Sequence, residues 1–240
     1  MYFYLFLAIA SLNAQVTSQS KNSPISVLSS VKSVDIKDSN EIITFDPLWV
    51  DSLSLSLPCY EVPVPKRTMR LPNAPRNYRN GTHRGLDFFA NWGTPVRSVA
   101  EGVVVRSDLH YEEVPADFRE NLLKATTKVG HTPSDIFNSV LLGKSVFLDH
   151  GFDLIPGFRT ISIYAHLSHI EKEIVPGAIV KRGELLGKSG NTGMRESTIG
   201  SKAGSHLHWE MILQKGEQEI YLGKGMSNPE LYDMLFRIFN

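Results

Sequence analysis

The chain has 240 residues, of which 42% are hydrophobic, and this is enough to bury one good core. Its 25 basic and 25 acidic residues balance to a formal net charge of zero, so no global field points to nucleic acid or to an anionic membrane surface as a partner. The single cysteine, Cys59, excludes an intramolecular disulfide framework and a cysteine-rich zinc finger.

The first residues predict export. Residues 2–10 form an apolar run, and small residues suited to cleavage follow, ending at Ala14. The run is too short to span a bilayer, and no later run approaches the roughly 20 apolar residues of a transmembrane helix. We expect a signal peptide over residues 1–14, no stable membrane insertion after its removal, and a periplasmic, cell-envelope or secreted protein. The alternative is an uncleaved anchor, because no Lys or Arg precedes Lys21.

Residues 15–68 predict a linker followed by an N-terminal strand region. The first part, to about residue 40, is rich in Ser, Lys and Asn without a sustained period. Apolar and polar residues then alternate over 41–44 and 52–57, which is typical of half-buried strands. Prolines after residue 57 keep this region out of a central sheet. We expect an edge strand; a propeptide-like segment covering a cleft is the alternative.

The main domain is expected over residues 69–240, and its first candidate site lies in a glycine-flanked stretch over 81–89. His83 and Asp87 are four residues apart, so a strand would place both side chains on one face. Arg76, Tyr78 and Arg79 precede this stretch in a basic, turn-rich segment. They either line the entrance to the site or belong to a solvated loop.

Strand signals alternate with one helical interruption. The β-branched run over 98–105 suggests paired strands with a tight turn at its glycine. Residues 107–142 break the strand pattern and predict a helical insertion, with one helix from Pro115 to near Gly130 and a second from Thr132.

Further strands are expected over 145–151, 160–167 and 184–188, before a loop over 189–204. His166 lies at the end of one of these strands, where its side chain can project into a cleft. Apolar residues at helical spacing predict a C-terminal packing helix that begins near Pro229. The recurring apolar residues of this helix are Leu231, Met234, Leu235 and Ile238.

Residues 205–211 read as a buried strand that carries His206 and His208. Side chains two apart on a strand share a face, and buried imidazoles need a metal or hydrogen-bond partners. His208, His83 and Asp87 would make a three-ligand set that leaves the fourth tetrahedral position open, as in catalytic rather than structural zinc sites. We assign the remaining histidines a structural or surface role; they are His110, His131, His150 and His169.

Together, His83-x-x-x-Asp87, Tyr164-Ala165-His166 and His206-x-His208, with their flanking Gly/Pro turns, resemble the lysostaphin or LytM-type zinc endopeptidases over about residues 70–213. The resemblance implies a mainly β, compact antiparallel sheet domain with a groove. It also implies one Zn²⁺ per chain on His83, Asp87 and His208, catalytic assistance from His166 and His206, and peptidoglycan stems or cross-bridges as substrate.

The insertion over about 107–142 departs from the family, which usually has a short loop there, and it could dock a regulatory partner. Because some relatives act only as binders, the alternative function is a noncatalytic cell-wall-binding or amidase-activating envelope protein. A zinc dipeptidase or carboxypeptidase shares a His/Asp/His site but does not fit the motif spacing. No His-Glu-x-x-His helix is present, so proton transfer falls to His206 or His166, and the sequence does not decide which is the base.

Overall fold

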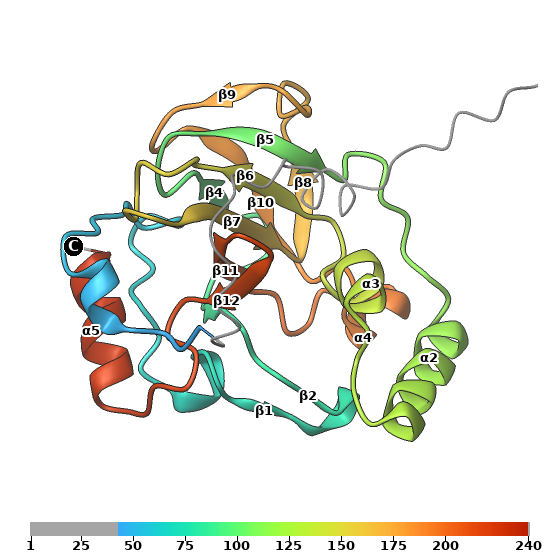
Figure 1. The fold of residues 1–240 in the computed structure, drawn as a ribbon. Coiled ribbons are helices and arrows are strands. Elements are labelled where there is room, and N and C mark those ends of the chain that lie inside the picture. Colours follow the sequence, from blue (N-terminus) through green and yellow to red (C-terminus); the bar gives the residue numbers. More distant parts are fainter. Residues whose placement is uncertain (1–42, 240) are drawn as a thin grey trace, which may run out of the picture. The chain divides into compact units, whose positions relative to one another are not determined.

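The computed structural model describes residues 43–239, and antiparallel strands dominate this part of the chain (Figure 1). The largest sheet has seven strands: β3 (Leu86–Phe88), β5 (Gly102–Ser107), β6 (Val146–Asp149), β7 (Arg159–Ala165), β9 (Ile179–Val180), β11 (Leu207–Lys215) and β12 (Gln218–Tyr221). Its order is β12-β11-β7-β6-β5-β9, and β3 also pairs with β11. The expected mainly β, antiparallel fold is confirmed.

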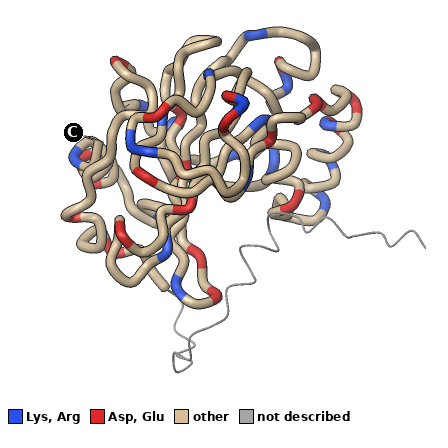
Figure 2. Tube along the Cα trace, turned by 90° about the horizontal axis from the view of Figure 1, so that it is seen from above, with Lys and Arg blue, Asp and Glu red and all other residues tan. Residues whose placement is uncertain are grey.

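Two smaller sheets complete the strands. A three-stranded sheet has the order β4-β10-β8, from β4 (Pro95–Arg97), β8 (Leu167–Ile170) and β10 (Leu185–Ser189). A two-stranded sheet pairs β1 (Pro75–Arg76) with β2 (Gly81–Thr82). Residues of both charge signs are interspersed along the trace (Figure 2).

The helical insertion is confirmed between β5 and β6. It contains α2 (Ala116–Val129), α3 (Ser134–Ile136) and the π-helix η4 (Phe137–Leu141). Helix α2 ends at Gly130, whose φ of 87° is the left-handed conformation that glycine adopts without strain. The other helical elements are α4 (Arg195–Thr198), α5 (Glu230–Ile238) and the 3₁₀ turns η1 (Pro47–Val50), η2 (Thr68–Arg70) and η3 (Asn77–Arg79). None of the helices between residues 43 and 239 combines the length and apolarity needed to cross a bilayer.

Strand β11 is the centre of the core, because eight of its nine residues are buried. It pairs with β3 on one stretch and with β7 along most of its length. Trp209 on β11 is fully buried together with Tyr164 and Phe88 from these neighbours. The register places His208 opposite Asp87 on β3 and opposite Ala165 on β7. Pairing of the core strands therefore brings the sequence-distant site residues together.

The C-terminal helix packs as its apolar spacing predicts. Leu231, Met234, Leu235 and Ile238 of α5 are all buried. The following residue, Phe239, makes edge contacts with the Trp209 and Phe88 rings at centroid distances of 5.1 and 5.6 Å.

Three strand predictions are wrong. Residues 52–57 form no strand, although Leu53 and Leu55 are buried. The segment packs on the core through single backbone hydrogen bonds to Val99 and Ile238, and these do not continue into a strand pairing. Residues 98–105 do not pair as a hairpin, since β4 and β5 join different sheets. The stretch 81–89 breaks into β2 and β3, with His83 between them. The expected signal peptide and the linker up to residue 42 lie outside the described residues.

Candidate metal centre

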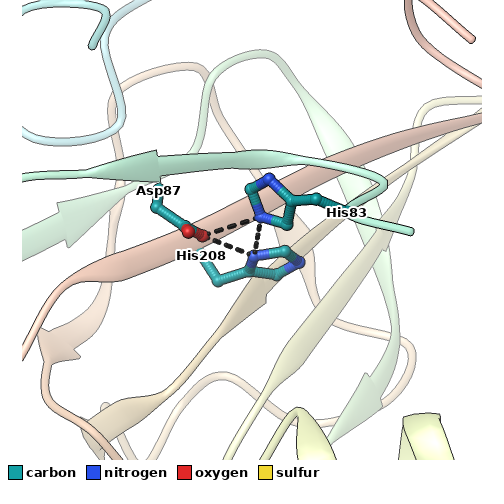
Figure 3. A group of neighbouring side chains, drawn as sticks. All are labelled: His83, Asp87 and His208. Carbon is teal, nitrogen blue, oxygen red and sulfur yellow. Dashed lines mark hydrogen bonds and ion pairs between the residues drawn. The ribbon is translucent and has the colours of Figure 1, made fainter. Parts of the chain in front are cut away.

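His83, Asp87 and His208 point toward one another from the β2–β3 connection, β3 and β11 (Figure 3). Asp87 Oδ1 lies 2.9 Å from His83 Nε2 and 2.8 Å from His208 Nδ1, and the two nitrogens are 3.1 Å apart. All three residues are buried. Tetrahedral zinc with bonds of about 2.1 Å separates its ligand atoms by roughly 3.4 Å, so the three atoms, slightly closer together, already form one face of such a site.

The hydrogen bonds behind the two imidazoles fix which ring atoms carry protons. His83 Nδ1 donates to the Leu71 carbonyl at 2.9 Å, and His208 Nε2 donates to Glu210 Oε1 at 2.8 Å. With each outer nitrogen protonated, a neutral ring turns its lone pair inward, toward the other imidazole and the carboxylate. Three electron-rich atoms that converge in a buried site need a cation between them. The donor set therefore fits Zn²⁺.

Asp87 is held as an anion and in a fixed orientation. Burial raises the pKa of its carboxyl, but attraction to His83 and His206 outweighs this and holds the pKa well below its usual range. Its second oxygen, Oδ2, pairs with Arg76 at 3.0 Å, which leaves Oδ1 for the metal. Burial lowers the pKa of His83, so this imidazole is neutral at pH 7.

Glu210 also belongs to the site, although it was not among the predicted site residues. It is fully buried, pairs with Arg84 at 2.9 Å and accepts the bond from His208. Burial would raise its pKa, but Arg84 and His208 lower the pKa to about 2. For His208, burial acts in the opposite direction and would lower the pKa. Asp87 and Glu210 outweigh it and together raise the pKa of His208 to about 9. The same period-two argument that links His206 to His208 could have identified Glu210.

His166 and His206 stand beside the three-atom cluster. His206 Nδ1 donates to the Gly204 carbonyl at 2.8 Å, and its Nε2 lies 3.5 Å from Asp87 Oδ1. His166 follows β7 with a left-handed φ of 60°, and its Nδ1 donates to the Thr192 carbonyl at 2.8 Å. Its ring centroid lies 4.9 Å from that of His206 and 5.6 Å from that of His208. The structure thus places all five predicted site residues in one group.

A cavity of about 480 Å³ opens onto this group and reaches each of the five residues. The predicted basic segment contributes Arg76, Tyr78 and Arg79 to its lining. The insertion contributes a further wall that includes Arg119, Leu123 and Phe137. An open face toward a cavity is what a catalytic metal site requires.

His150 lies outside the cavity and is structural, as expected. It is buried, with Nδ1 2.6 Å from the Glu101 carbonyl and Nε2 2.7 Å from the Ser162 hydroxyl. His110, His131 and His169 are exposed. Cys59 is buried, and burial raises the pKa of its thiol to about 12, so it is not a nucleophile at neutral pH.

Residues 125–220 match the model of peptidase family M23. Over this segment the chain is similar to the M23 peptidases. The matched segment includes His166, His206 and His208, whereas His83 and Asp87 precede it. M23 metallopeptidases are zinc-dependent, and the cluster of His83, Asp87 and His208 can hold such an ion.

Similar proteins include an uncharacterized metalloprotease of Buchnera aphidicola, 26% identical over 141 residues. The match covers 59% of this chain and 26% of the relative, so the chain spans about a quarter of that protein's length. The catalytic domain of the antimicrobial peptidase lysostaphin from Staphylococcus simulans is 20% identical, covering 71% and 87% of the two chains with a TM-score of 0.37. A zinc-containing peptidase from Vibrio cholerae is 20% identical, covering 69% and 39% with a TM-score of 0.36.

Proposed function

We propose that the protein is an exported zinc metalloendopeptidase that hydrolyses peptide bonds in peptidoglycan stems or cross-bridges. The observation that carries this proposal is the inward-facing set of His83 Nε2, Asp87 Oδ1 and His208 Nδ1 on the wall of a cavity. Two further histidines flank that set. A structural zinc site would close the fourth position with a protein ligand, whereas this one opens on space for a substrate.

When bound, zinc would polarise the scissile carbonyl and lower the pKa of water toward about 7, so that hydroxide is available as the nucleophile at neutral pH. The chain's own contribution is to hold and move protons. His206 and His166 each donate through Nδ1 to a backbone carbonyl, so each presents Nε2 as the basic nitrogen. Burial, followed by the neighbouring His206 and His208, holds the pKa of His166 well below its usual range. One of the two takes a proton from water at Nε2, and the other, once it has been protonated at Nε2, donates that proton to the leaving amine.

Two variants separate the ligand role from the proton-transfer role. His208→Ala removes a ligand atom and should abolish stoichiometric zinc. His206→Ala should retain zinc, measured by elemental analysis, and lose about 100- to 10,000-fold in turnover, because proton transfer contributes that much. Equal loss of zinc in both variants would contradict this division. His166→Ala should behave as His206→Ala.

The proposed activity is tested on purified peptidoglycan incubated with the full chain, with and without a chelator. Mass spectrometry should detect new peptide fragments that disappear when the chelator is present, and their masses would identify the bond. A folded chain that holds zinc and yields no fragments would refute the peptidase.

That negative outcome would instead favour a noncatalytic cell-wall-binding or amidase-activating protein. One observation supports this second candidate: the insertion leaves Phe118 and Val129 of α2 at 52% and 60% exposure. Such side chains could contact a partner protein. Co-sedimentation with intact peptidoglycan, followed by mixing with an amidase, separates wall binding from amidase activation.

A further inference from the structure

The cavity beside the metal centre is rich in arginine. Four arginines and three carboxylates line it. Two of the arginines are already paired, since Arg76 lies 3.0 Å from Asp87 and Arg195 lies 3.8 Å from Glu120. The other two, Arg79 and Arg119, have no carboxylate within ion-pair distance among residues 43–239.

Arg119 comes from the insertion and is only 7% exposed. Its Nε donates to the Gly193 carbonyl at 3.0 Å. Its two terminal nitrogens donate no hydrogen bond to any described residue, and they are not sealed from solvent. The Arg119 side chain is part of the lining of the cavity beside the metal centre.

Arg79 lies in η3, against which helix α2 packs, and is 6% exposed. Its Nη2 donates to the Thr82 carbonyl at 2.6 Å, and its guanidinium lies 4.7 Å from the centre of the Phe137 ring. The Thr132 hydroxyl of the insertion donates to the Arg79 carbonyl. The insertion thus contributes Arg119 to the cavity lining and also contacts Arg79, which lines the same cavity.

The segment that supports Arg119 is fixed by the partly buried carboxylate of Glu113. Glu113 Oε2 accepts bonds from the Gly193 amide at 2.9 Å and from the Ser197 hydroxyl at 2.6 Å. These contacts join the insertion to the loop before β11. A guanidinium that is already positioned loses little freedom when it binds an anion.

A buried cation without a counterion is costly once water leaves the cavity. A substrate that fills the cavity displaces that water, so it must bring a negative charge or leave the arginines uncompensated. We propose that Arg119, together with Arg79 from the same cavity lining, binds a carboxylate of the peptide substrate and selects peptides that carry an acidic group near the scissile bond. This inference rests on the proposed peptidase function and assigns substrate selection to the insertion.

The test uses a peptide series with one scissile sequence, cleaved by the zinc-loaded full chain. One arm converts the C-terminal carboxylate to a carboxamide, and the other converts a side-chain carboxylate. A charge-assisted bond contributes about 1.5–3 kcal/mol, so one amidation should lower kcat/KM about 10- to 100-fold, and the arm that does so identifies the source. Arg119→Gln should abolish the preference.

Arg195→Gln is the matched control, because Arg195 lines the same cavity but is already paired with Glu120. It should keep the ratio between acid and amide peptides. If Arg119→Gln does not fold, Arg119→Lys provides the test: it keeps the charge but loses the planar fork, and should retain only part of the preference.

Equal cleavage of acidic and amidated peptides by the wild type would overturn the inference and leave the peptidase standing. If no peptide is cleaved, the peptidase fails, and calorimetry of the same peptides still decides the inference. Acid peptides that bind at least about tenfold tighter than amides, with the difference lost in Arg119→Gln, would support it. Equal binding would overturn it.

Discussion

Glu210→Gln tests how far a residue that never touches the metal controls its binding. Glu210 is fully buried, accepts a hydrogen bond from His208 Nε2 at 2.8 Å and lies 2.9 Å from an Arg84 nitrogen. Glutamine has nearly the same shape, and its amide oxygen can still accept from His208. The substitution therefore removes the charge and keeps the packing and the ring orientation.

Zinc affinity should fall because the carboxylate makes the His208 ring more basic. Loss of a carboxylate behind a ligand histidine weakens metal binding by about 10- to 100-fold, and we expect about tenfold because the hydrogen bond survives. The pKa of His208 is raised to about 9 after burial is offset by Asp87 and Glu210, so the substitution also lowers that pKa. Weaker competition from protons then hides part of the loss at neutral pH. The deficit should be larger at pH 9 than at pH 7.

Stability of the metal-free protein should fall as well. Removal of one partner of a fully buried ion pair costs about 3–5 kcal/mol. The Arg84 side chain is 29% exposed, so water can solvate part of the charge that is left behind. We therefore expect a decrease of about 2 kcal/mol in the free energy of unfolding.

Competition with a chromophoric chelator measures zinc affinity at both pH values, and urea unfolding measures stability. Glu219→Gln is the matched control, because this glutamate is exposed on β12 and pairs with Gln214, away from the cavity. It should leave zinc affinity unchanged. Wild-type affinity in Glu210→Gln at both pH values, or an equal loss in the control, would show that the Glu210 carboxylate does not strengthen zinc binding.

Zinc uptake by the wild type should release about one proton per ion near neutral pH, because the raised pKa of His208, about 9, leaves that ring protonated in the metal-free protein. The apparent zinc affinity should then rise about tenfold per pH unit and level off above pH 9. Calorimetry in several buffers measures the proton release, and finding none would contradict the prediction. Gly85→Ala should lower the free energy of unfolding by about 1–3 kcal/mol and weaken zinc binding, because its Cβ would press on the Trp209 carbonyl oxygen and lie 2.7 Å from Glu210 Cγ; an unchanged melting temperature would count against it. His150→Ala should cost about 1–3 kcal/mol in urea unfolding by leaving the Glu101 carbonyl and Ser162 hydroxyl without their partner, and a loss of zinc would disprove its structural role.

The strands that carry the site could be predicted because local patterns and long-range pairing agree there. The buried run around His208 and the strand before His166 are strongly apolar and pair with each other. Alternation failed over residues 52–57 for a physical reason: an extended segment packed on a core alternates in burial whether or not it pairs as a strand. Alternation of apolar and polar residues therefore indicates which side chains are buried, but a β-strand also needs backbone hydrogen bonds to a neighbouring strand.

The residues behind the ligands can be placed on a face by their spacing, but their roles could not be predicted, since these depend on partners from other elements. Glu210 follows the period of two, but its charge is meaningful only because Arg84 lies beside it. Arg119 looks like a surface residue of an amphipathic helix, yet it is buried against Gly193. The neighbouring Phe118 on the same helix is half exposed. A long basic side chain can cover a core as an apolar one does.

The insertion is coupled to the metal centre by contact as well as by the cavity wall. Phe137 of η4 lies under the Arg84 guanidinium, 4.4 Å from the ring centre. Arg84 pairs with Glu210, and Glu210 bonds to the ligand His208. Leu142, directly after η4, also accepts the backbone N–H of His166 at 2.9 Å. A displacement of the insertion would thus move the Arg84 guanidinium relative to Glu210, behind the ligand His208. It would also shift the backbone that positions the proton-transfer residue His166. Substrate binding at Arg119 acts on that same insertion, so recognition and metal chemistry share one structural element.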